Sequence, residues 1–246
     1  MTAYGLIGKS LKHSFSKDYF TKKFEKEGIN AAYQNFEVES AEMILSLLSE
    51  NHAIRGLNVT IPFKETILPF LDEIDADALK IQAVNTIKID RSESLKLTGF
   101  NTDHIGFSQS LKPLLESRSK IKALILGSGG AAQAVKYAVK SLGIEFQVVS
   151  RTPNSSAIAY NQLSKDIIRN HQLIINTTPL GMVPYTDSSP AIPYQFLTQA
   201  HICYDLIYNP GETSFLKNAG QQGCTIKNGY EMLELQAEAS WKIWNT

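Results

Sequence analysis

Four clusters of polar side chains stand at the ends of predicted strands in the N-terminal part of the chain. Each combines hydroxyl, amide, amine or carboxylate groups that can hydrogen-bond a small polar molecule. The clusters are His13-Ser14-Phe15-Ser16, Asn58-Val59-Thr60-Ile61-Pro62-Phe63-Lys64, Ala83-Val84-Asn85-Thr86 and Asn101-Thr102-Asp103. Open α/β sheets bind their ligands at this edge, so the placement of the clusters predicts a substrate site there.

Lys64 is held in place by the residues that precede it. It follows a buried strand and the rigid Pro62, so its backbone is held in place. Asp103 could lie across a crevice from Lys64. Ser14 and Ser16 are two residues apart on an extended segment and could face one anion, although Ser16 could equally cap the first helix.

The segment after residues 121–126 has the pattern of a dinucleotide-binding turn. Gly127-Ser128-Gly129-Gly130-Ala131-Ala132 matches G-x-G-x-x-A between an apolar strand and a helix. The first glycine permits a tight turn, the second lets a pyrophosphate approach the backbone, and Ala132 permits close packing of helix on strand. The N-terminus of the helix then offers its N–H groups to the phosphates. An ordinary strand-to-helix turn is the alternative.

The end of the next strand indicates which nucleotide binds. NAD-binding proteins usually place an acidic residue there to accept a hydrogen bond from the ribose 2′-hydroxyl. This chain has Ser150-Arg151-Thr152 instead, and a guanidinium can pair with a 2′-phosphate. We therefore expect NADP (NADPH) as the cofactor, with a solvated surface Arg151 as the alternative.

Apolar runs and helical patterns alternate along the whole chain. Strands are expected at 4–7, 32–38, 56–60, 121–126, 146–149, 173–176 and 202–206, helices at 18–27, 41–49, 131–142 and 231–244, and a hairpin at 83–98. This order predicts the α/β class, with two doubly wound domains and a cleft between them. We expect a substrate-binding and catalytic domain over 1–101 plus 229–246, and a Rossmann-like dinucleotide-binding domain over 102–228.

The composition argues against several classes of partner. The 246 residues include 24 Lys and Arg and 24 Asp and Glu, a balance without the basic footprint of a nucleic-acid binder. The sequence contains neither a polybasic run nor a long apolar span, so it does not predict membrane attachment. The two cysteines are too few for a disulfide framework and form no metal-ligand spacing, and the N-terminal apolar run is too short for a signal peptide. We expect a cytoplasmic monomer or homodimer that binds small molecules and no metal.

Taken together, the motifs resemble those of the shikimate dehydrogenase family, and the match runs nearly end to end. Beyond the motifs above, the chain has Asn176-Thr177-Thr178-Pro179-Leu180-Gly181, Tyr204-Asp205-Leu206-Ile207-Tyr208-Asn209-Pro210 with Thr213, and Gly229-Tyr230-Glu231-Met232-Leu233 with Gln236. The resemblance implies reversible NADPH-dependent reduction of 3-dehydroshikimate to shikimate, in chorismate and aromatic amino-acid biosynthesis.

The resemblance also implies a role for each matching residue. Lys64 and Asp103 would be the catalytic pair, with Lys64 as the proton donor to the forming alkoxide. The substrate-binding residues would be Ser14, Ser16, Thr60, Asn85, Tyr208 and Gln236. The cofactor-binding residues would be Gly127, Ser128, Gly129, Gly130, Ala131, Ser150, Arg151, Thr152, Thr177, Leu206 and Gly229.

Two positions bear on the alternatives. No second arginine follows Arg151 among residues 152–155, which weakens the 2′-phosphate clamp and leaves dual use of NAD and NADP open. A threonine at position 16 would resemble the quinate-using branch of the family. This chain has Ser16 there, so shikimate is favoured over quinate. The alternatives are a quinate/shikimate dehydrogenase that uses NAD and a non-catalytic nucleotide-binding regulatory module. The presence of both Lys64 and Asp103 argues against the regulatory module.

Overall fold

The computed structural model describes residues 1–11, 14–116, 118 and 120–246, and its contacts divide the chain into two compact units. Unit 1 comprises Met1–Thr102 and Gln236–Thr246, and unit 2 comprises Asp103–Leu235. The return to unit 1 was predicted at residue 229. The contacts place it at Gln236, because the last helix, α9 (Tyr230–Trp244), starts within unit 2 and ends within unit 1.

Unit 1 is built on a six-stranded sheet in the order β2-β1-β3-β5-β6-β4. The strands β1, β2 and β3 are parallel, as are β4 and β6, while β5 is antiparallel to both of its neighbours. The predicted hairpin is confirmed, with Ile87 opposite Gly99. The strands are β1 (Thr2–Gly8), β2 (Ala31–Glu37), β3 (Ile54–Val59), β4 (Glu73–Ile74), β5 (Thr86–Asp90) and β6 (Lys96–Phe100).

The helices of unit 1 lie in the connections between its strands. The predicted helix at 41–49 is a 3₁₀ turn (Ala41–Met43) followed by α2 (Ile44–Glu50), which buries Ile44 and Leu48 against the sheet. The other helices are α1 (Phe15–Glu27), α3 (Phe63–Thr66) and α4 (Ala76–Ile81). Helices as short as α2, α3 and α4 depend on packing against the sheet for their stability.

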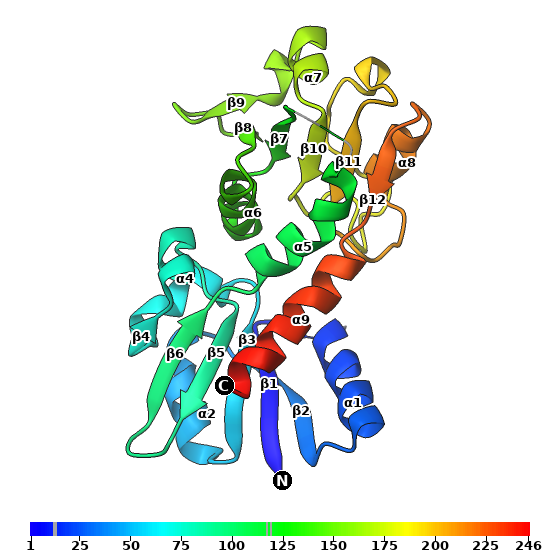
Figure 1. The fold of residues 1–246 in the computed structure, drawn as a ribbon. Helices are drawn as coiled ribbons and strands as arrows, with labels where there is room; N and C mark the ends of the chain where they lie inside the picture. The colour runs from blue at the N-terminus through cyan, green and yellow to red at the C-terminus, as the bar shows by residue number, and fades with distance from the viewer. Residues whose placement is uncertain (12–13, 117, 119) are drawn as a thin grey trace. The chain divides into compact units, whose positions relative to one another are not determined.

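Unit 2 is an all-parallel sheet in the order β12-β11-β10-β7-β8-β9, as the doubly wound prediction requires (Figure 1). The central strands are almost wholly apolar and buried, because helices cover both faces of such a sheet. Its strands are β7 (Lys122–Leu126), β8 (Glu145–Ser150), β9 (Ala157–Ala159), β10 (Leu173–Asn176), β11 (Ile202–Asp205) and β12 (Thr225–Lys227). Its helices are α5 (Asp103–Leu115), α6 (Gly130–Ser141), α7 (Lys165–Asn170) and α8 (Ser214–Gly220).

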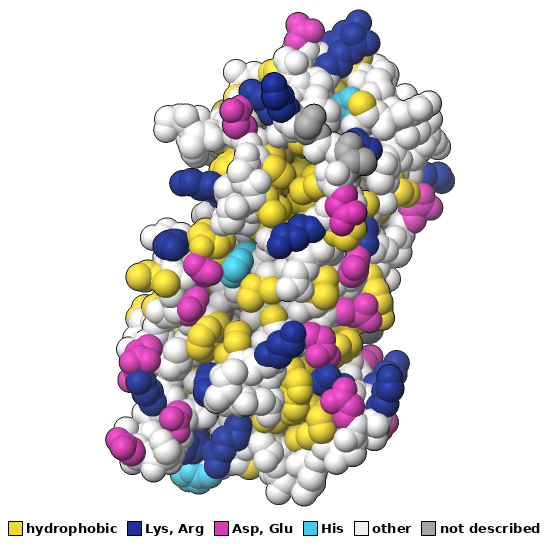
Figure 2. Space-filling view, in the orientation of Figure 1, with side chains coloured by type: hydrophobic (Ala, Val, Ile, Leu, Met, Phe, Trp, Pro, Cys, Tyr) yellow, Lys and Arg dark blue, Asp and Glu magenta, His cyan; other side chains and the backbone are white. Residues whose placement is uncertain are grey.

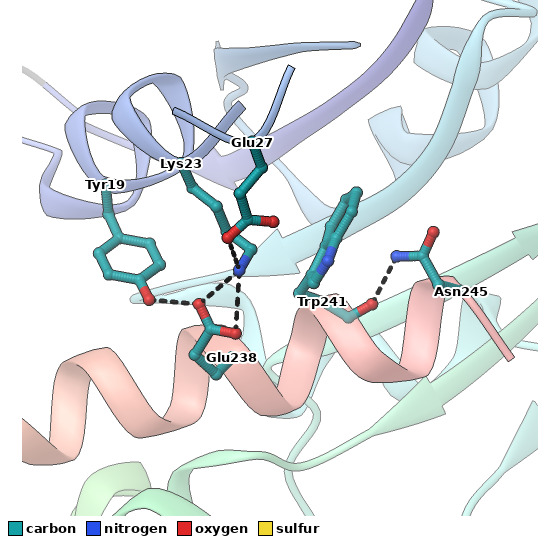
Figure 3. A network of polar contacts seen from close by, with 6 residues as sticks. All are labelled: Tyr19, Lys23, Glu27, Glu238, Trp241 and Asn245. Carbon is teal, nitrogen blue, oxygen red and sulfur yellow. Dashed lines mark hydrogen bonds and ion pairs between the residues drawn. The ribbon is translucent and has the colours of Figure 1, made fainter. Parts of the chain in front are cut away.

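The C-terminal half of α9 is fastened to α1 by charged and hydroxyl groups. Figure 3 shows Glu238 of α9 accepting a hydrogen bond from the hydroxyl of Tyr19 and pairing with Lys23, whose Nζ lies 3.0 Å from Glu238 Oε1. Lys23 also reaches Glu27, with 2.9 Å between Nζ and Oε1. One lysine therefore links two carboxylates on different helices.

The end of α9 fills an aromatic cluster next to this network. Trp244 is buried, stacks on Tyr4 at 4.9 Å between ring centroids, and donates from Nε1 to the Ile87 carbonyl at 3.0 Å. Phe20 and Tyr33 stack at 4.7 Å in the same cluster. The final helix thus completes the core of unit 1.

The surface carries charges of both signs. On the face drawn in Figure 2, Lys and Arg side chains alternate with Asp and Glu, as a formal net charge of zero leads one to expect. Among the residues described, no helix combines the length and apolarity needed to cross a lipid bilayer.

Replacing Trp244 with Ala tests how far unit 1 depends on the last helix. We expect the free energy of unfolding of unit 1 to fall by roughly 3–5 kcal/mol, the usual cost of truncating a buried aromatic. Urea unfolding followed by circular dichroism measures it. Leu79→Ala, at a side chain that is 62% exposed, should change stability by less than about 0.5 kcal/mol. Equal losses in the two variants would show that α9 is peripheral.

Candidate active site

The predicted residues of unit 1 meet in a buried cluster of amides and hydroxyls around Asn85. Asn85 Nδ2 donates to Thr102 Oγ1 at 3.0 Å and to Gln236 Oε1 at 3.4 Å, and Asn85 Oδ1 accepts from the Thr102 N–H at 2.7 Å. All three residues are buried, so these groups depend on one another for hydrogen bonds. The hydrogen bond between Asn85 and Gln236 joins two residues that are 151 positions apart in the sequence.

A second chain of hydrogen bonds runs from this cluster toward Ser16. Asn58 Nδ2 donates to Ser240 Oγ at 3.0 Å, and Ser240 Oγ lies 3.1 Å from Thr102 Oγ1. Tyr33 donates its hydroxyl to Asn58 Oδ1 at 2.8 Å. Burial raises the pKa of Tyr33 well above its usual value, while a hydrogen bond with Ser16 acts in the opposite direction. The buried Ser16 hydroxyl is therefore connected to the polar cluster.

The structure corrects the assignment of the helix cap. The cap is Ser14, whose Oγ accepts from the Lys17 N–H at 3.2 Å, and α1 begins at Phe15 rather than at the predicted residue 18. Ser16 lies inside the first turn and its side chain is buried. The capping alternative for Ser16 is wrong, which leaves its hydroxyl available for another role. His13 lies outside the described residues.

Thr60 and Lys64 follow the carboxyl end of β3. The Thr60 N–H donates to the Ile7 carbonyl at 3.0 Å, and the Thr60 carbonyl accepts from Phe63 at 2.9 Å, which starts α3. The Lys64 carbonyl accepts from the Val84 N–H at 2.8 Å, directly before Asn85. The backbone of Lys64 is thus fixed next to the segment that carries Asn85.

The glycine turn of unit 2 has the form that a dinucleotide requires. Gly127 has φ +113°, and a Cβ there would lie 2.6 Å from Thr177 Oγ1, so only glycine fits. Gly129 precedes α6, and a Cβ there would meet open space. The first-turn N–H groups of a helix have no partners within the helix and favour an anion. These residues fit a pyrophosphate.

Hydroxyl groups and one guanidinium follow β8. Ser150 is buried at the strand end, its Oγ lies 3.3 Å from Ser128 Oγ, and it accepts from the Thr152 N–H at 3.2 Å. Arg151 and Thr152 are exposed. Ser150 therefore connects the glycine turn to the segment that carries Arg151.

A third group of predicted residues surrounds Asp205, the last residue of β11. Leu206 follows it, and a Cβ on Gly229 would overlap the Leu206 carbonyl oxygen, so Gly229 must be glycine. The Gly229 N–H donates to the Ile207 carbonyl at 3.1 Å. Asp205 has no exposed surface, and burial raises its pKa to about 6.

The predicted residues thus fall into two sets. Six belong to unit 1, namely Ser14, Ser16, Thr60, Lys64, Asn85 and Gln236, and the others belong to unit 2. Asp103 opens α5 and Tyr208 follows β11, both in unit 2, so the pairing of Asp103 with Lys64 stays a prediction. Within the described part of the chain, no three His, Cys, Asp or Glu side chains gather closely enough to hold a metal ion.

Sequence reasoning missed Tyr33 and Ser240 as members of the polar cluster. Ser240 is one helical turn from Gln236, and its hydroxyl donates to the Gln236 carbonyl at 3.0 Å. Two polar residues four apart on an otherwise apolar face were a usable signal. Tyr33 gave no such signal, because a tyrosine in a strand is normally a packing residue.

Comparisons with known proteins agree with this geometry. The family model described as the shikimate dehydrogenase substrate binding domain matches residues 6–87. A shikimate dehydrogenase (NADP(+)) of Caldicellulosiruptor saccharolyticus is 37% identical over 255 residues, covering 97% of this chain and 90% of the relative. The crystal structure of shikimate dehydrogenase from Aquifex aeolicus superposes with a TM-score of 0.88 at 34% identity and covers 100% of this chain and 92% of its own. The crystal structure of the Thermus thermophilus shikimate 5-dehydrogenase in complex with NADP(H) and shikimate superposes with a TM-score of 0.86 at 30% identity. It covers 99% of this chain and 93% of its own.

Asp205→Asn should change how stability depends on pH. The folded-state pKa of Asp205, about 6, lies above its ordinary 3.8, so the folded protein binds the extra proton and loses stability as pH rises between these values. At pH 7 the ionised carboxylate should cost about 3 kcal/mol, an upper figure from about 1.4 kcal/mol per pKa unit. The free energy of unfolding of Asp205→Asn relative to wild type should therefore increase between pH 4 and pH 7.

Urea unfolding across that pH range measures the difference. Asp187→Asn, at an exposed loop position, is the matched control and should leave the pH dependence unchanged. A constant difference between Asp205→Asn and wild type at all pH values would contradict the raised pKa.

Proposed function

The chain belongs to the shikimate dehydrogenase family, and from this premise we propose that it reduces 3-dehydroshikimate reversibly to shikimate with NADPH, in aromatic amino-acid biosynthesis. The observation that carries the proposal is the cluster of Asn85, Thr102 and Gln236 in unit 1. Amides and hydroxyls fixed by one another are suited to hydrogen-bonding the hydroxyls of a ring. Thr60, at the end of the neighbouring strand β3, belongs to the same binding set.

We assign the substrate carboxylate to the hydroxyls of Ser14, Ser16 and Tyr208. Ser16 supports this assignment because its hydroxyl is buried and held beside Tyr33, and it would turn its proton from the Tyr33 oxygen to the carboxylate when the substrate binds. A hydroxyl fixed in this way binds an anion with little loss of conformational entropy. Ser14 also caps α1, so its Oγ would serve both the helix and the ligand.

We assign the pyrophosphate of NADP to Gly127, Ser128, Gly129, Gly130 and Ala131. The 2′-phosphate goes to the segment Ser150–Thr152, where Arg151 is exposed and can form a bidentate pair. Thr177, Leu206 and Gly229 stand near the ends of β10, β11 and β12 and would line the nicotinamide side. When bound, the nicotinamide supplies or accepts the hydride.

The protein must then handle one proton, and we assign this to Lys64 with Asp103. The Lys64 ammonium would donate a proton to the carbonyl oxygen of the substrate as that oxygen becomes an alkoxide. The ammonium would also stabilise the negative charge on the oxygen. Lys64 supports this role through its backbone, which is held against Val84 beside Asn85.

Absorbance of NADPH tests the function directly. Purified enzyme mixed with shikimate and NADP should produce NADPH absorbance, and NAD should give a lower rate. Arg151→Gln should reduce the preference for NADP by about 10- to 150-fold, since a charge-assisted pair with phosphate contributes about 1.5–3 kcal/mol. Quinate assayed in parallel separates the quinate-using alternative. If none of these combinations of substrate and cofactor gives turnover, the regulatory module becomes the better interpretation.

Lys64→Ala should lower kcat by about 10²- to 10⁴-fold, the usual contribution of a positioned proton donor, with little change in KM. Lys80→Ala is the matched control, because Lys80 is an exposed lysine whose Nζ lies 3.8 Å from Asp77. Steady-state kinetics of both variants give the comparison. Lys64→Ala with a kcat near that of wild type would remove this residue from the chemistry.

A further inference from the structure

Asp205 is a buried carboxylate to which the proposed chemistry gives no task. Among the described residues, its three hydrogen-bond partners are neutral. Its Oδ1 accepts from Asn176 Nδ2 at 3.0 Å and from the Ile207 N–H at 3.0 Å, and its Oδ2 accepts from Thr213 Oγ1 at 2.6 Å. A carboxylate is costly to bury, and an amide of the same shape would avoid most of that cost.

The first donor leads to the loop after β10. Asn176 ends that strand, and its Oδ1 accepts from the N–H and the hydroxyl of Thr178 at 3.0 and 2.7 Å. Between them, Thr177 Oγ1 donates to the Leu126 carbonyl at 2.7 Å and packs against Gly127. Asp205 therefore orients the amide that shapes the loop carrying Thr177.

The second and third donors lead to the turn after β11 and to α8. The bond from Ile207 closes the turn around Leu206, and the Leu206 carbonyl lies against Gly229. Thr213 caps α8 by accepting from the Leu216 N–H at 3.3 Å while donating to Asp205. One carboxylate thus joins the segments that carry Thr177, Leu206 and Gly229.

We propose that Asp205 is a positioning residue that holds Thr177, Leu206 and Gly229 in the arrangement that orients the nicotinamide. The inference rests on the proposed function and deepens it. An ionised carboxylate holds its donors more strongly than a neutral acceptor does, and it accepts from all three without donating. Displacement of a ring by about 1 Å can cost about 10²-fold in rate, so fixed loops are worth a loss of stability.

The test compares NADPH with a nucleotide that has no nicotinamide. Asp205→Ala should raise KM for NADPH and lower kcat, each by roughly tenfold. The KM for 3-dehydroshikimate and the Kd for adenosine 2′,5′-bisphosphate, measured by calorimetry, should stay within about twofold. Asp205→Asn keeps the shape and the two bonds at Oδ1 but loses the charge and the bond from Thr213, so its activity should lie between those of Asp205→Ala and the wild type.

Ser110→Ala is the control for a purely structural effect. Ser110 is buried in unit 2, and its Oγ lies 2.7 Å from the hydroxyl of Tyr204. Tyr204 is the residue directly before Asp205. Ser110→Ala should lower stability and leave the kinetics with NADPH unchanged. If Asp205→Ala does not fold, Thr213→Val removes the donor to Asp205 Oδ2, together with the cap of α8, at nearly constant shape and should raise KM for NADPH about threefold.

The outcomes are distinct. Equal weakening of NADPH and adenosine 2′,5′-bisphosphate in Asp205→Ala, or equal kinetic effects of Asp205→Ala and Ser110→Ala, would overturn the positioning role. Unchanged NADPH kinetics in Asp205→Ala would also overturn the positioning role. If Asp205→Ala is unfolded, unchanged NADPH kinetics in Thr213→Val would overturn it instead. A wild-type protein without turnover would instead overturn the proposed function itself.

Discussion

Polar groups buried at the ends of strands must find hydrogen-bond partners, because an unpartnered buried donor or acceptor costs about 1–3 kcal/mol. In unit 1 this requirement joins Asn58 and Asn85 to hydroxyls contributed by β5, α9 and Thr102. In unit 2 it joins Asp205 to Asn176 and Thr213. The loops that leave each sheet are therefore fixed by side chains that belong to its interior.

Charge is used in opposite ways at the two ends of the proposed nucleotide site. Arg151 is exposed, so its charge stays hydrated at little cost and can meet a phosphate when one arrives. Asp205 is wholly buried, and its charge acts on neutral donors of the protein itself. An exposed charge is suited to selecting a ligand, whereas a buried one is suited to fixing the backbone.

Much of the fold could be predicted from the sequence because its central strands coincide with short, mostly apolar runs. The strands β7, β10 and β11 and the hairpin of β5 and β6 lie close to their predicted positions. The sequence did not predict β9, β12 or α7, because these elements show no distinct apolar run or periodicity and are stabilised by packing. It also did not predict α5, although that helix has 13 residues. The same limit applied to the site. The spacing of Ser14 and Ser16 suggested a shared role, but only the start of α1 shows which hydroxyl caps the helix.

The order of the units along the chain has a consequence for biosynthesis. Unit 2 ends at Leu235, whereas unit 1 still lacks the segment that begins at Gln236. Domains generally fold as units, starting from the N-terminus as the ribosome delivers them. Here the first unit to be synthesised is finished after the second, because Tyr4 has no Trp244 to stack on until α9 has been synthesised. Nascent chains should therefore expose the face of Tyr4 that Trp244 covers to chaperones until all of unit 2 has been made.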